Sequence, residues 1–212
     1  MLTFRLLNNI IILLHIHNLK FIKLQRLRKM NKPEINKLDR KEFELLWGAA
    51  VEGDPLDRLV FVCAGHLGMR SSEIAHLKKD WIDFQSGTVE VPKKDEEFRA
   101  NGSSRSIPFK HLRDRVTTEL RRYFDYNRVV GVNRATIFRR VKNMAQRADL
   151  TCKVNPQALR STCAFQLAKA GVNAQGLKQF MGWKELNTAQ KYIEQVGVDA
   201  EKQIKRNKDK LW

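Results

Sequence analysis

The sequence contains few cysteines and no spacing that groups them. Its three cysteines are Cys63, Cys152 and Cys163, and no Cys-x-x-Cys pair occurs among them. An odd number without such a pair argues against a disulfide framework and against a zinc site. Two of the three fall among apolar helical positions, so we predict small core residues in a protein of a reducing compartment.

The motifs of nucleotide and metal chemistry are also missing from the sequence. It has no P-loop, and its histidines, cysteines and acidic residues show no metal-ligand spacing. His15 and His17 lie close together, but two histidines without further ligands nearby are a weak metal signal. Nucleotide-driven and metal-dependent reactions are therefore not indicated.

Acidic residues are scarce relative to basic ones. The chain has 40 Lys and Arg against 23 Asp and Glu, which gives a formal net charge of +17 over 212 residues. A charge of this size on a small protein implies a polyanionic partner, and nucleic acid is the interpretation that we favour. Acidic lipid and a merely soluble basic surface are the alternatives.

No hydrophobic run has the length of a bilayer span. The apolar run at residues 10–14 is short, basic residues flank it, and no small-residue cleavage site follows. It predicts either a basic amphipathic helix on a membrane or partner, or residues that precede a natural start at Met30. We favour the second interpretation and assign residues 1–37 to an N-terminal arm, disordered or from an over-long start.

Helical patterns dominate the remainder of the chain. A hydrophobic content of 42% suffices for the core of one domain. Alternating residues at 88–91 and 106–109 predict a small antiparallel hairpin or three-stranded sheet. The fold class is therefore mainly α with a small antiparallel β-sheet. Helix caps and apolar rows predict helices over residues 39–53, 54–68, 114–127, 133–148, 156–170 and 173–182, and one that begins near Asn187.

The start of the helix at 156–170 has the properties of an anion site. Asn155 and Pro156 are an N-cap and a first helical residue. Gln157 and Arg160 lie three apart on the first turn, so they project from one face beside free backbone N–H groups. This arrangement suits a phosphate.

Another arginine follows the predicted helix at 54–68. That helix is apolar on most sides, so we expect it to be buried, and Arg70 comes directly after it. An arginine in such a place is normally satisfied by a carboxylate, and Glu73 is the obvious local partner. A structural ion pair is therefore the simplest interpretation of these two residues alone.

The helix at 133–148 combines an apolar row with basic residues on its other sides. A helix of this kind can enter a DNA major groove, where arginines reach phosphates or guanine edges. The alternative is a solvated charged face. The polar and basic residues concerned are Asn133, Arg134, Arg139, Arg140 and Lys142.

Three segments resemble the sequence boxes of one known family. They read GHLGMRSSEIAHLKKDWID from Gly65, PQALRSTCAFQLAKAG from Pro156 and MGWKELNTAQKYI from Met181. Their content and order resemble the catalytic domain of the tyrosine recombinase (phage integrase) family. The resemblance covers roughly residues 38–194, which we take as the catalytic domain, with residues 195–212 as a charged tail.

The resemblance implies a site-specific recombinase or integrase that cuts and rejoins DNA. Tyr192 would attack and form a 3′-phosphotyrosyl link, while Arg70 and Arg160 hold the phosphate and Glu73 helps to orient the site. Trp183 would donate its indole N–H to a phosphate oxygen. The family carries a general-acid lysine on a hairpin; Lys93 and Lys94 are both candidates, with Lys94 preferred and Lys93 otherwise assigned to DNA binding. No cofactor is needed, because the covalent link keeps the energy for rejoining.

One position departs from the family pattern. Gln157 stands where the family usually has histidine, and glutamine cannot exchange a proton near neutral pH. Catalysis would then be slow but measurable. The alternatives are a catalytically weak or inactive DNA-binding protein of the same fold, a type IB topoisomerase-like nicking-closing enzyme, and an unrelated helical DNA-binding regulator.

The resemblance also implies partners and a place in the cell. The partner would be double-stranded DNA, with four protomers assembled on two duplexes. The helix at 133–148 matches one that contacts DNA in the family, so the resemblance assigns its residues Asn133, Arg134, Arg139, Arg140 and Lys142 to DNA binding. The tail at 195–212 would either dock on a neighbouring protomer or fray at the chain end. We expect no membrane association, a cytoplasmic place on the nucleoid, and a prokaryotic, viral or plasmid-borne gene. Integration, excision and chromosome-dimer resolution all remain open at this stage.

Overall fold

The computed structural model describes residues 35–100, 102–150 and 153–197. The chain divides into two units, Met1–Ile35 and Asn36–Trp212, and the fold described below belongs to the second. Most of the predicted arm at 1–37 and most of the predicted tail at 195–212 lie outside the described residues, as does Cys152. Both assignments therefore stay predictions.

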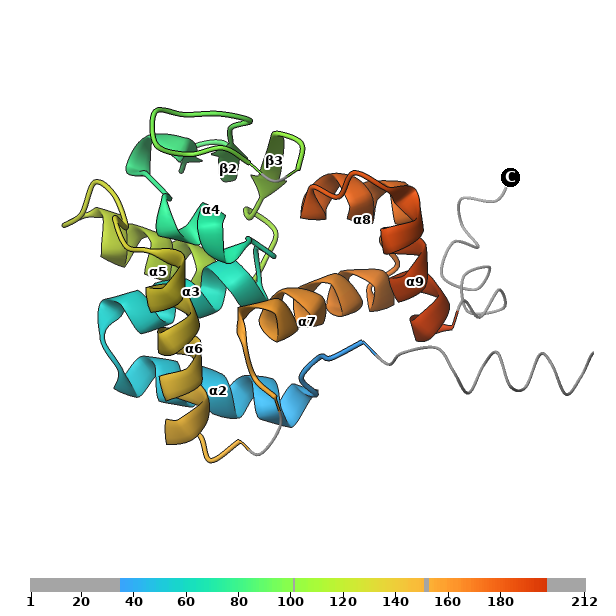
Figure 1. The fold of residues 1–212 in the computed structure, drawn as a ribbon, viewed down its shortest axis with the longest axis horizontal. Helices are drawn as coiled ribbons and strands as arrows, with labels where there is room; N and C mark the ends of the chain where they lie inside the picture. The colour runs from blue at the N-terminus through green and yellow to red at the C-terminus, as the bar shows by residue number, and fades with distance from the viewer. Residues whose placement is uncertain (1–34, 101, 151–152, 198–212) are drawn as a thin grey trace, which may run out of the picture. The chain divides into compact units, whose positions relative to one another are not determined.

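The described part of the chain is mostly helical and carries one small sheet, as the sequence predicted (Figure 1). Its three strands are β1 (Ile82–Asp83), β2 (Thr88–Val91) and β3 (Arg105–Pro108). A short 3-10 helix, Lys79–Trp81, precedes β1. The α-helices are α2 (Arg40–Glu52), α3 (Pro55–Gly65), α4 (Ser71–Ala75), α5 (Asp114–Phe124), α6 (Arg134–Arg147), α7 (Pro156–Lys169), α8 (Ala174–Met181) and α9 (Leu186–Val196).

Side-chain caps explain why most of these helices begin where they do. Asp54 accepts hydrogen bonds from two backbone N–H groups at the start of α3, where Pro55 supplies a fixed φ. Asn155 caps α7 in the same way, again followed by a proline. Helices α4, α5 and α9 begin without a hydrogen bond to an N-cap side chain. Helix α9 begins at Leu186 after N-cap Glu185, so the predicted N-cap at Asn187 was late by two residues.

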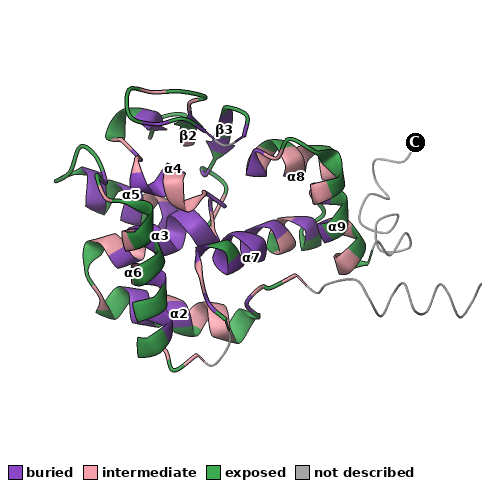
Figure 2. Ribbon diagram, viewed as in Figure 1, coloured by how far each residue is buried: buried purple, intermediate pink, exposed green. Residues whose placement is uncertain are grey.

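Helix α3 is the centre of the domain. Every residue from Leu59 to Gly65 is buried, which confirms the prediction of an interior helix. Helices α2, α5, α6 and α7 pack around it, and buried residues gather along their inner faces (Figure 2). Cys63 and Cys163 are buried free thiols, as predicted. The helix ends at Gly65, earlier than predicted, because the chain turns at Gly68 with φ +58°.

The sheet is antiparallel with strand order β1-β2-β3. Val89 pairs with Ile107, and Val91 pairs with Arg105. Strand β3 begins one residue earlier than the sequence predicted, so Arg105 lies in the strand and not in the loop before it. Figure 1 shows β3 beside α8, which brings the hairpin next to the C-terminal helices. No helix within the described ranges is long and apolar enough to cross a membrane.

A buried carboxylate fixes α6 against the helices beneath it. Asp57 of α3 is 1% exposed and accepts hydrogen bonds from Arg147 Nη2 at 2.6 Å and Arg140 Nη1 at 3.4 Å. Arg147 also donates to the Ala49 carbonyl oxygen of α2. Because α6 carries the predicted DNA-binding residues, this network sets where they are presented.

We expect Asp57→Ala to lower the free energy of unfolding by about 2 kcal/mol, because the charged donors of Arg147 and Arg140 lose a buried acceptor. Urea unfolding at neutral pH measures this change. Glu52→Gln replaces an exposed acid at the end of α2 and should leave the free energy unchanged. Equal stability of the two variants would show that the Asp57 network contributes nothing.

Candidate active site

Arg160 is a buried cation in the first half of α7. It is 3% exposed, and its two Nη atoms donate to the carbonyl oxygens of Gly68 and Met181. These contacts tie α7 to the turn after α3 and to the end of α8. Burial, together with the charge of Arg70, lowers the pKa of Arg160 to about 9. The guanidinium therefore remains charged at neutral pH.

Arg70 lies at the start of α4 and faces the same region. Its Nη1 donates to Glu73 Oε1 at 2.8 Å, and its Nη2 donates to the Gly182 carbonyl oxygen at 2.8 Å. Its backbone N–H donates to Glu73 Oε2 at 2.7 Å. The local ion pair that the sequence suggested is thus present. The Arg70 side chain is still 20% exposed, so it is accessible to a ligand.

Glu73 has a second partner that sequence reasoning missed. Arg105 of β3 donates through Nη1 and Nη2 to the two carboxylate oxygens of Glu73, each at 2.8 Å. Burial alone would raise the pKa of Glu73, but the hydrogen bonds and charge of Arg105 and the Arg70 backbone N–H lower it to about 2. A usable signal was strand alternation, since Ile107 faces the core and Arg105 shares its side of the strand.

Tyr192 lies near the middle of α9 and is 7% exposed. Its hydroxyl donates to Ser161 Oγ at 3.2 Å, and Ser161 follows Arg160 on α7. The Tyr192 ring stacks on Trp183, with centroids 5.1 Å apart and an interplanar angle of 19°. The Arg160 guanidinium carbon lies 6.0 Å from the Trp183 ring centroid. Tyrosine, tryptophan and arginine are therefore neighbours, with Ser161 as a member that the sequence did not reveal.

Gln157 lies at the edge of this cluster. It is exposed, whereas Arg160 one turn further along is buried. Its Nε2 lies 3.5 Å from Ser161 Oγ, the same oxygen that accepts the Tyr192 proton. The amide is thus connected to the tyrosine hydroxyl through one serine.

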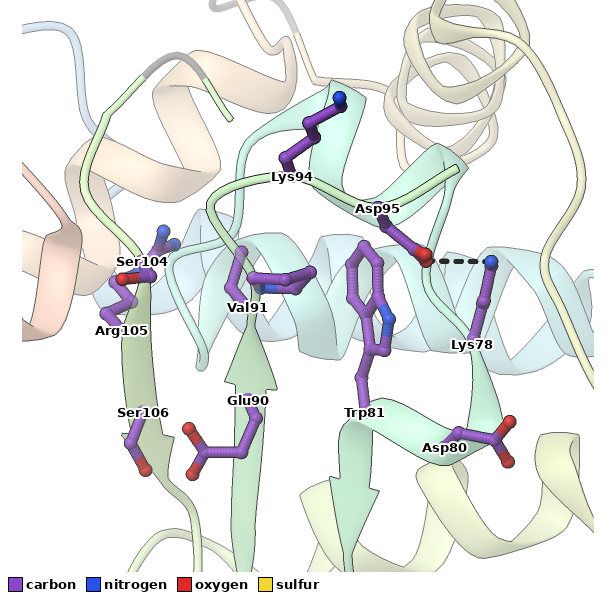
Figure 3. A pocket seen from close by; sticks show the side chains of 11 residues that line it. Lys78, Asp80, Trp81, Glu90, Val91, Lys94, Asp95, Ser104, Arg105 and Ser106 are labelled. Carbon is purple, nitrogen blue, oxygen red and sulfur yellow. Dashed lines mark ion pairs between the residues drawn. The ribbon is translucent and has the colours of Figure 1, made fainter. Parts of the chain in front are cut away.

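The two candidate lysines occupy different places. Lys93 Nζ donates to the Gly102 carbonyl oxygen at 2.7 Å. A Cβ atom added to Gly102 would lie 3.1 Å from both Nη atoms of Arg70, so Lys93 is held next to the arginine cluster. Lys94 instead lines a hollow of about 600 Å³ over the sheet, together with Trp81 and Arg105 (Figure 3).

The predicted DNA-binding residues of α6 are not equivalent. Arg134, Arg139 and Lys142 are exposed. Asn133 is exposed as well, but its side chain caps the helix by accepting from the Thr136 N–H. Arg140 differs from the other basic residues, because it forms ion pairs with Asp54 and the buried Asp57.

Comparison with known proteins identifies the family. A model of the phage integrase family matches residues 36–196. The chain belongs to the phage integrase family. Its relatives include a tyrosine recombinase of Thermosipho africanus, which is 28% identical over 151 residues, or 66% of this chain and 50% of that protein. Tyrosine recombinase XerA of Thermococcus kodakarensis is 27% identical over 169 residues, or 73% of this chain and 56% of that protein. The chain spans about half the length of these relatives.

Solved structures of recombinases share the fold of this phage integrase family member. The XerA recombinase crystal structure superposes with a TM-score of 0.64 at 20% identity, covering 86% of this chain and 66% of that one. The Tn1549 transposon integrase gives a TM-score of 0.60 at 18% identity, covering 83% of this chain and 66% of that one. The predicted family and fold class are therefore confirmed.

The acidity of Glu73 leads to a pH dependence of stability. Its pKa is about 2 in the folded protein against an ordinary 4.5, so its stabilising effect is fully present above pH 4.5 and disappears as the pH falls towards 2. We expect wild-type protein to lose on the order of 3 kcal/mol over this range, and Glu73→Gln to lose much less. Urea unfolding at several pH values measures both, with Glu90→Gln on the exposed face of β2 as a control. Parallel pH profiles for wild type and Glu73→Gln would contradict this account.

Proposed function

We propose that this domain cuts and rejoins DNA through a covalent link to Tyr192, as a site-specific recombinase or integrase. The observation that carries the proposal is the position of the Tyr192 hydroxyl. It is bonded to Ser161 on the helix that holds Arg160, and its ring lies against Trp183. A phenol beside buried guanidinium groups suits attack on a phosphodiester.

The arginines would stabilise the charge that develops on the phosphate. Their N–H groups match phosphate oxygens in geometry and stay charged at neutral pH. Arg70 is the more accessible of the two, and the two arginines donate to adjacent carbonyl oxygens, Arg70 to that of Gly182 and Arg160 to that of Met181. Trp183 can add one indole N–H to the same anion, because an indole nitrogen only donates.

The reaction exchanges one ester bond for another. The Tyr192 oxygen forms a bond to phosphorus while the bond from phosphorus to the 5′ oxygen breaks, and the departing oxygen takes a proton. The product is a 3′-phosphotyrosyl ester with a free 5′ hydroxyl. Attack of a 5′ hydroxyl on that ester reverses the step, so rejoining needs no nucleotide or metal cofactor.

We assign the proton for the leaving oxygen to Lys93 in preference to Lys94. An ammonium group can act as a general acid only within hydrogen-bond reach of its target. Lys93 Nζ is bonded to Gly102, which abuts Arg70, whereas Lys94 lies over the sheet with Trp81. The contacts around Arg70 therefore support Lys93, although the sequence favoured Lys94.

Gln157 should make the first step slow. It can hydrogen-bond a phosphate or Ser161, but it cannot accept the Tyr192 proton at neutral pH. Losing a general base typically costs ~100- to 10,000-fold in rate. This residue also favours a second candidate function, namely a DNA-binding protein of the same fold with little or no catalysis.

DNA would lie against the exposed face of α6 and the hairpin loop. Arg134, Arg139 and Lys142 are exposed, whereas Arg140 forms an ion pair with Asp54. Solved relatives support DNA as substrate: XerH recombinase is described bound to difH DNA, and lambda integrase as a dimer on a COC′ core site. We infer that protomers also associate here on DNA, up to four on two duplexes, with residues 195–212 as the contact. A gene on a mobile element or provirus and action on the nucleoid fit this function.

Covalent trapping tests the proposal directly. The protein is incubated with a pool of nicked duplexes drawn from the DNA that flanks its own gene, and adducts are resolved on a denaturing gel. We expect an adduct with wild type and none with Tyr192→Phe. Tyr126→Phe is the matched control, because Tyr126 is 89% exposed and should leave the adduct unchanged. Salt-sensitive DNA binding without any adduct would favour the binding protein instead.

Arg139→Gln should weaken DNA binding at low salt and make the slope of log K against log salt less negative by ~1, because one phosphate contact is lost. Fluorescence anisotropy with a random duplex at four salt concentrations measures the slope. Arg122→Gln removes an arginine of α5 that is paired with Glu119 and serves as the control. An unchanged slope in Arg139→Gln would exclude this residue as a phosphate contact.

A further inference from the structure

All three guanidinium nitrogens of Arg105 donate hydrogen bonds inside the protein. It is 7% exposed, its two Nη atoms bind Glu73, and its Nε donates to the Phe180 carbonyl oxygen at 2.9 Å. These bonds join β3 to α4 and to the end of α8. Three of its five N–H donors are therefore used inside the protein. Its side chain is 2% exposed against 20% for Arg70, so Arg105 is much less accessible to a phosphate than Arg70.

Two glycines allow this junction to close. Gly182 has φ +62°, and a Cβ atom there would lie 2.8 Å from Arg105 Cδ. At Gly102 a Cβ atom would lie 2.7 Å from the Gly182 carbonyl oxygen. The hairpin loop, Arg105 and the turn before Trp183 therefore meet without room for a side chain at either glycine.

The same junction fixes where Lys93 leaves the sheet. Arg105 pairs with Val91, the last residue of β2, and Lys93 follows two residues later. On the other arm of the hairpin, Gly102 receives the Lys93 ammonium at 2.7 Å. Arg105 thus fixes both strands of the hairpin where the loop that carries Lys93 begins and ends.

The shared carboxylate also affects the charge of the site. Arg70 alone with Glu73 would be a neutral pair. Because Arg105 binds both oxygens of Glu73, the cluster with Arg160 keeps an excess of positive charge towards the open side, where Arg70 is 20% exposed. This excess positive charge would attract an incoming phosphate.

We propose that Arg105 is a positioning residue that locks the β2–β3 hairpin to the α8–α9 turn, so that Lys93 is held in register with Arg70 and Trp183. The inference rests on the proposed function in one respect, namely that Lys93 protonates the leaving oxygen. Arg105 touches neither substrate nor reacting atoms, so its loss should act through the lysine.

A change of leaving group separates this role from a general loss of structure. When the bridging 5′ oxygen of a nicked duplex is replaced by sulfur, the Tyr192 oxygen still bonds to phosphorus but a thiolate departs. A thiol has a pKa of ~8.5, so this departure needs no proton from a general acid. The probe is the duplex that wild-type protein labels, made in oxygen and sulfur forms.

We expect Arg105→Met to slow adduct formation at least ~100-fold on the oxygen duplex and only a few-fold on the sulfur duplex. Arg105→Lys should behave alike, because an ammonium cannot make the paired bonds to Glu73. Arg70→Met should be slow on both duplexes. Arg58→Met breaks the buried pair with Glu119 on α3 and α5 and should leave the oxygen-to-sulfur ratio at the wild-type value. Equal slowing of Arg105→Met and Arg105→Lys on both duplexes would overturn the proposal.

Hydrogen–deuterium exchange provides a readout that does not need catalysis. Arg105→Lys and Arg105→Met should exchange faster than wild type at residues 92–100 and at 180–184 together, while Arg58→Met should not. If wild type forms no adduct on any duplex, the proposed function fails, and this measurement then decides the role of Arg105. Unchanged exchange in both segments would overturn the positioning role in that case.

Discussion

The structure depends on one buried carboxylate. Glu73 is fully buried, and a carboxylate in that position is stable only when donors satisfy both of its oxygens. Arg105 and Arg70 supply them from β3 and from the start of α4. Each of the two also donates to one carbonyl oxygen near the end of α8. A sheet, a short helix and the C-terminal helices are thereby held around a single negative charge.

In the proposed reaction, this arrangement fixes the phosphate-binding donors before the substrate arrives. Arg160 is oriented by the carbonyl oxygens of Gly68 and Met181, and Arg70 by that of Gly182. Donors that are already fixed need little reorganisation when charge develops on a phosphate. Tyr192 is held in the same region by a hydrogen bond and by stacking on Trp183. The electrostatic and nucleophilic parts of the proposed reaction therefore share one scaffold.

Gln157, which stands where the family usually has histidine, lies outside the network that holds the arginines. The amide is exposed and reaches Tyr192 only through Ser161. The arginine scaffold does not depend on it, which explains how the fold and the cation cluster persist without a histidine there. In the proposed reaction, phosphate binding and proton transfer therefore depend on different residues.

The sequence by itself determined the longer helices, their order and the residues of the three boxes, but not the five-residue helix α4. Caps such as Asp54 and Asn155 and apolar rows are local signals, so spacing along the chain reveals them. Only the tertiary structure decided that Arg105 binds Glu73, 32 residues away, that Lys93 and not Lys94 adjoins Arg70, and that Arg140 is taken by Asp54. These pairings follow from strand register and helix packing over long separations, and no local pattern of residues encodes such distances.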